Sequence, residues 1–147
     1  SATVVASDPM NDLALLRVYG ARGLKPLNLA GGGGKTAIDL IGIADPQGQG
    51  GGNAVSSVKA SLNGADLLPA PAIGFAGAAA VDADGKFAGL AQLKPVQVAG
   101  PADGTPPQAA LVPADAVRNF LKANGVNAAG TSADVRAAIV RVICVRK

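Results

Sequence analysis

Short apolar runs separated by turn residues constrain the fold of this chain more than any other feature. Gly, Pro, Asn and Asp interrupt the sequence so often that few runs are long enough for a helix. Many short strands with one late helix are typical of a β-barrel or a β-sandwich. We expect strands within residues 2–7, 12–20, 36–44, 54–64, 77–93 and 109–113, the fifth range holding a hairpin around the turn "DADGK".

One segment has the pattern of a helix, "PADAVRNFLKANG" at 113–125. Val117, Phe120 and Leu121 recur at helical spacing, which gives the segment one apolar face. Pro113 suits the first turn and Gly125 is placed as the C-terminal stop. The fold class predicted from these patterns is therefore all-β, a barrel or a sandwich with one C-terminal helix.

Composition excludes several classes of function. The 147 residues contain no His and a single Cys, so the usual general base of neutral-pH catalysis is absent and ordinary zinc sites are excluded. No cofactor is expected. The net charge of +3 is scattered and forms no basic stripe, which argues against nucleic acid as a partner. No apolar run reaches transmembrane length, so we expect no membrane insertion.

The glycine-rich stretch "LAGGGGKT" at 29–36 has some features of a phosphate loop. That motif needs a Gly where Leu29 stands, and a helix must follow it to hold the phosphate. Here the following residues predict a strand. We interpret the stretch as a connection between strands.

A series of motifs resembles the trypsin-like serine proteases. "VVASDPMNDLALLRV" is similar to the strand, turn and strand that carry the triad aspartate, at Asp12, and "AIGFAGAAAVDADGKFAGLAQL" at 72–93 is similar to the segment around the nucleophile. The order of motifs over residues 2–126 is closest to the bacterial Deg-type (high-temperature-requirement) branch. The resemblance implies an all-β fold with the six-stranded C-terminal barrel and helix of that family at 21–126, preceded by the last hairpin of the first barrel at 1–20.

The departures from the family pattern imply a loss of catalysis. Ala76 stands where the nucleophilic serine would be, and a methyl group cannot attack a carbonyl. Asp12 has no imidazole in this chain to orient. We therefore expect no enzymatic activity, with Asp12 and Ala76 as vestigial triad positions.

The resemblance also implies what could survive that loss. The backbone N–H groups of Gly74 and Ala76 correspond to an oxyanion hole, and backbone donors do not depend on a side chain. The strand segment Ala91, Gln92 and Leu93 corresponds to the one that pairs with substrate by strand addition. Phe75 either fills the former specificity pocket or is an ordinary core residue.

Function is thus expected to be non-catalytic, a peptide- or protein-binding or assembly module of a larger bacterial protein. Two alternatives stay open: a fragment of a serine endopeptidase whose N-terminal half supplies the histidine, and a structural domain without a ligand. The sequence does not fix the compartment, although the resemblance favours a periplasmic or secreted location.

Residues 127–147 lie beyond the family pattern. We expect a linker followed by a terminal strand at 137–147, "AAIVRVICVRK", because β-branched residues dominate it. Most of the first barrel is absent from this sequence, so the N-terminal hairpin lacks its usual cover. The terminal strand is predicted to supply that cover, either within the chain or from a second copy in a strand-swapped homodimer.

Overall fold

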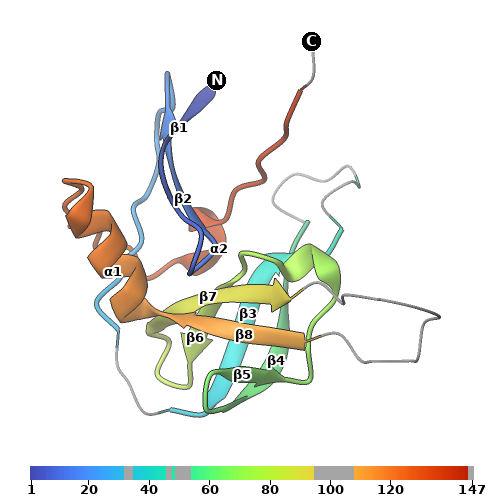
Figure 1. The fold of residues 1–147 in the computed structure, drawn as a ribbon. Coiled ribbons are helices and arrows are strands. Elements are labelled where there is room, and N and C mark those ends of the chain that lie inside the picture. Colours follow the sequence, from blue (N-terminus) through green and yellow to red (C-terminus); the bar gives the residue numbers. More distant parts are fainter. Residues whose placement is uncertain (32–34, 46–47, 49–53, 95–107, 146–147) are drawn as a thin grey trace.

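A closed antiparallel barrel forms the body of the molecule (Figure 1). This computed structural model describes residues 1–31, 35–45, 48, 54–94 and 108–145. The strands follow one another around the barrel in the order β3-β4-β5-β8-β7-β6. Their bounds are β3 (Ala37–Ile43), β4 (Val55–Asn63), β5 (Asp66–Leu68), β6 (Ala79–Asp82), β7 (Phe87–Lys94) and β8 (Gln108–Pro113).

The barrel interior is filled mainly by alanines and a few large side chains. Leu40, Leu67 and Phe75 are the largest fully buried residues, and all three belong to this interior cluster. Small residues fit between them, which explains how a chain with only 3% aromatic residues still closes a core. The remaining buried members are Ile38, Ala60, Ala78, Ala80, Ala91 and Ala109.

A second apolar layer lies on the outside of the barrel, beneath helix α1 (Ala114–Ala123). Val117 of the helix packs there with Val81, Phe87 and Val112 of the strands, and Phe120 and Leu121 lie at its margin. The helix follows Pro113 directly, and Gly125 beyond its end has φ +73°, a backbone conformation that favours glycine. The predicted helix and its two boundary residues are therefore confirmed.

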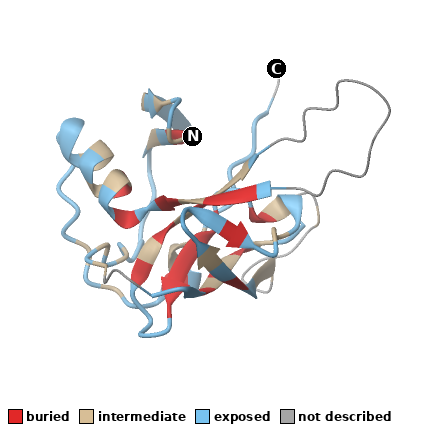
Figure 2. Cartoon of the chain, turned by 60° about the horizontal axis from the view of Figure 1, so that its bottom comes forward, coloured by how far each residue is buried: buried red, intermediate tan, exposed pale blue. Residues whose placement is uncertain are grey.

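An N-terminal hairpin stands on this outer layer. Strands β1 (Ala2–Asp8) and β2 (Leu13–Val18) pair only with one another among the described residues. Leu13 is buried with the second layer, whereas most of the hairpin is exposed (Figure 2). The hairpin predicted from the sequence is confirmed, as is the mostly β barrel with its C-terminal helix.

The predicted terminal strand is wrong for this structure. Val135–Ala138 forms a short helix, α2, and residues 139–145 form no strand. The carboxylate of Asp134 accepts a hydrogen bond from the N–H of Ala137 at 3.3 Å, and Val135 is buried in the second layer. These two contacts favour a helical turn where β-branched composition alone predicted a strand. Nor does this segment pair with the chain's own hairpin.

Other elements agree with or extend the sequence expectations. The segment after the glycine-rich stretch is strand β3, so the test for a phosphate loop fails, although residues 32–34 of that stretch lie outside the description. Strand β5 was not expected. Residues 95–107, between β7 and β8, also lie outside the described residues. No helix in the described ranges is long and apolar enough to cross a membrane.

Candidate functional site

The turn that resembles a nucleophile loop is a single 3-10 turn, η2 (Ile73–Phe75), which ends at Ala76. The Ala76 side chain is exposed, so it is accessible but chemically inert. Its backbone N–H donates to the carbonyl of Ile73 at 3.1 Å. One of the two expected oxyanion donors therefore has an acceptor within the chain, and a ligand oxygen would have to displace that carbonyl.

Gly74 is required by the packing of this turn. A Cβ atom at Gly74 would lie 2.0 Å from the carbonyl oxygen of Ala44 and 2.7 Å from that of Ile43. Backbone atoms cannot retreat as the end of a flexible side chain can, so no larger residue fits. Close packing against the end of β3 therefore explains why position 74 is a glycine, whether or not its N–H binds a ligand.

Phe75 belongs to the barrel core. Its ring is 2% exposed and packs in the interior cluster with Leu40 and Ala91. A ligand docked on the surface cannot reach the ring in this conformation. The sequence left two interpretations of Phe75 open, and its buried position here is that of a core residue.

Asp12 lies in the exposed turn of the hairpin, with φ +51°. It directly precedes Leu13, which packs in the same layer as Ala79, three residues beyond Ala76. The hairpin therefore contacts the outer layer of the barrel through Leu13, whereas the Asp12 side chain is exposed. No catalytic constellation is assembled from Asp12 and Ala76.

The hydrogen-bonded carboxylate of the hairpin turn is Asp8 rather than Asp12. Its two oxygens accept from the N–H of Met10 at 3.1 Å and from the side-chain amide of Asn11 at 2.8 Å. The Asn11 side chain is the main cause that lowers the pKa of Asp8 below its usual value. These bonds hold the turn. A sequence signal was present in "DPMN", because Asp and Asn at turn ends commonly bond nearby backbone.

The proposed peptide-pairing strand has an open edge, but not at its first residue. Ala91 donates its N–H to the carbonyl of Ala78 at 2.9 Å and accepts from the N–H of Gly77 at 2.8 Å. Because backbone directions alternate along a strand, the N–H and C=O of Leu93 face this same edge. Gln92 faces β8 instead, opposite Ala110. Beyond Ala91, the described part of the chain provides no strand partner on this edge.

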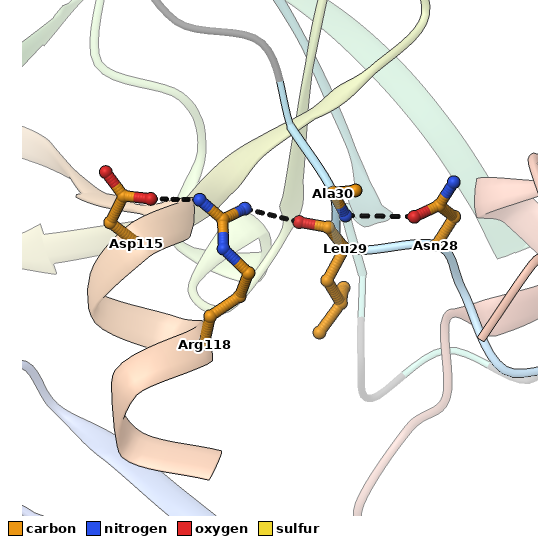
Figure 3. A network of polar contacts seen from close by, with 5 residues as sticks. All are labelled: Asn28, Leu29, Ala30, Asp115 and Arg118. Carbon is orange, nitrogen blue, oxygen red and sulfur yellow. Dashed lines mark hydrogen bonds and ion pairs between the residues drawn. The ribbon is translucent and has the colours of Figure 1, made fainter. Parts of the chain in front are cut away.

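A cavity of about 300 Å³ lies at the beginning of α1, where charged side chains meet. Arg118 donates to the carbonyl of Leu29 at 2.5 Å and pairs with Asp115, which ties the helix to the segment between β2 and β3 (Figure 3). Lys35 pairs with Asp84 at 3.7 Å on the rim. Charges around the cavity are thus balanced, and it presents no uncompensated cation to an anionic ligand.

Asp82 lines the same cavity and was not singled out by sequence reasoning. It is 5% exposed, and one carboxylate oxygen accepts from the N–H groups of Asp84 at 2.9 Å and Lys86 at 3.0 Å. The side chain therefore closes the β6–β7 turn. Within the described ranges, no group of three His, Cys, Asp or Glu residues is placed to hold a metal ion.

Comparison with protein-family models, with curated proteins and with solved structures finds no match to this chain. The resemblance to trypsin-like proteases therefore rests on the sequence motifs alone.

Proposed function

We propose that this chain is a non-catalytic trypsin-like domain that holds an extended peptide or protein segment, as a binding and assembly module of a larger bacterial protein. Two features of the sequence support the non-catalytic part. Ala76 offers no nucleophile, and a chain without His offers no general base of the usual kind. The close backbone contacts of the nucleophile-like turn agree with a structural rather than a chemical role.

The observation that carries the binding part is the edge of β7 at Leu93, with which no strand in the described ranges pairs. An unpaired strand edge presents N–H and C=O groups at the spacing that an extended peptide needs. The side chain of Leu93 is half-buried against the barrel interior, which fixes the strand and orients its edge. A bound segment would continue the sheet from Leu93, next to the bonds that Ala91 already makes to Gly77 and Ala78.

Exposed apolar side chains support assembly. Val4, Val5 and Val18 of the hairpin are exposed, and the hairpin stands away from the main body in Figure 1. An exposed apolar surface of this kind is typical of an interface. We include a strand-swapped homodimer among the assemblies that this domain forms.

The test is binding of the immobilised chain to an array of short extended peptides. We expect a subset of peptides to bind, and we expect Leu93→Pro to lose them because proline removes the outward N–H. Leu93→Ala, which keeps that N–H, is the matched control and should retain binding. Exchange of the Leu93 amide hydrogen, measured with and without a bound peptide, gives a readout that does not depend on a variant.

Two results would contradict the proposal. Absence of any peptide bound above background would favour the structural domain without a ligand. Equal loss of binding in Leu93→Pro and Leu93→Ala, with no slowing of exchange at Leu93, would place the site elsewhere.

A further inference from the structure

The C-terminal segment 139–145, which we call the tail, is apolar and exposed. Ile139 at its start is extended, with φ −82° and ψ 128°, and packs at the margin of the second layer. The residues beyond it leave that layer: Val140 is 69% exposed, Val142 62%, Ile143 63% and Val145 83%. Such a run of exposed β-branched residues is suited to a strand but pairs with no sheet here.

The root of the tail is fixed on the barrel. Arg136 donates to the carbonyl of Val55 at 2.8 Å, and Arg141 donates to the carbonyl of Gly48 at 2.7 Å. These bonds anchor the tail beside the beginning of β4, whereas the hairpin is anchored through Leu13. The tail and the hairpin project from the same side of the barrel (Figure 1) without pairing.

The hairpin is a two-stranded sheet, and no strand of the described residues pairs with the outer edge of β1. The N–H of Tyr19 donates to the carbonyl of Ser1 at 3.0 Å, and alternation along the strand then turns the N–H and C=O groups of Ala2 and Val4 toward the open edge of β1. Val4 is 67% exposed and Val5 49%. An isolated two-stranded hairpin is marginal in water, and a third strand would stabilise it.

We infer that the tail of one copy adds as a third strand to the β1 edge of a second copy, in a reciprocal dimer. This inference rests on the assembly part of the proposed function and names its partner as the same chain. Among the described residues no strand pairs with the tail or with the outer edge of β1, and exposed β-branched side chains lie on both. In an isologous exchange each tail pairs with the hairpin of the other copy, so both tails and both hairpins are paired at once. The assembly therefore closes at two copies.

Cysteine cross-linking between two differently tagged copies tests the contact. Cys144 is the only cysteine of the chain and is exposed. One copy keeps Cys144, and the other carries Cys144→Ser with a single cysteine placed on β1, in turn as Thr3→Cys, Val4→Cys, Val5→Cys and Ala6→Cys. Each copy then has one thiol, so a mixed disulfide can join only a tail to a hairpin.

We expect a mixed disulfide at one or two of these positions under mild oxidation, because only some pairs bring the Cβ atoms within bonding distance. Lys59→Cys, on an exposed side chain of β4, is the matched control and should give none. Cross-linking of Cys144 to Cys144 alone, or no position on β1 above the Lys59→Cys level, would overturn the inference.

Sedimentation velocity of Val142→Asp gives a second, independent test. Val142 is exposed in a single copy, so the substitution leaves the monomer folded. In the dimer it would bury a charge, and we expect the dimer dissociation constant to rise about tenfold or more. An unchanged dissociation constant, or a native chain that is monomeric throughout, would contradict the exchange. Peptide binding at Leu93 should persist in Val142→Asp, so failure of this inference is separate from failure of the proposed function.

Discussion

Replacing Phe75 by alanine distinguishes a core residue from a ligand-binding residue. The ring is 2% exposed and sits with Leu40 and Leu67 in the barrel interior, among alanines that are too small to fill the space it leaves. Substitutions of this kind cost about 3–5 kcal/mol, from lost burial and from the cavity. A domain has about 5–15 kcal/mol of stability in total, so the loss is a large part of it.

Urea denaturation followed by far-ultraviolet circular dichroism measures this loss. With a slope of about 2 kcal/mol per molar urea, the midpoint of Phe75→Ala should fall by about 1.5–2.5 M. Ile73→Ala is the matched control in the same 3-10 turn, because Ile73 is 88% exposed and its truncation should change stability by less than about 0.5 kcal/mol. Equal midpoints for the two variants would refute the placement of the ring in the core.

Three further predictions concern carboxylates. Asp82→Ala should lower the free energy of unfolding by about 1–3 kcal/mol, because the N–H groups of Asp84 and Lys86 lose their acceptor. Asp12→Asn should change it by less than about 0.5 kcal/mol, since Asp12 is exposed; a loss above about 2 kcal/mol in urea would contradict this. Folding lowers the pKa of Asp8, so this carboxylate stabilises the folded state at pH values above its unfolded pKa of about 3.9. That stabilisation is lost as the pH falls through the folded pKa. Asn11→Ala should raise the folded pKa of Asp8 in an NMR titration.

The fold was largely readable from the sequence because turn residues mark the ends of most strands. "DADGK" predicted the β6–β7 turn, and Pro113 and Gly125 marked the limits of α1. The short strand β5 could not be predicted, since three residues carry little periodicity. The tail was mistaken for a strand because β propensity describes fitness for a sheet and does not supply a neighbouring strand.

The candidate site was only partly readable, because its decisive features are backbone contacts. Gly74 and Ala76 were chosen as donors by resemblance, but sequence does not reveal that the N–H of Ala76 is bonded to Ile73. In the same way, the sequence does not reveal that the backbone N–H and C=O of Ala91 are bonded to Ala78 and Gly77. The residue that faces the open edge is therefore Leu93.

The central claim is that this domain binds without catalysing, and intact-mass spectrometry after treatment with a serine-directed phosphonate tests it most directly. Both the native chain and Ala76→Ser should keep their unmodified mass, because a new hydroxyl at this exposed turn would have no base to deprotonate it. Stoichiometric addition of one phosphonate to either protein would contradict the account.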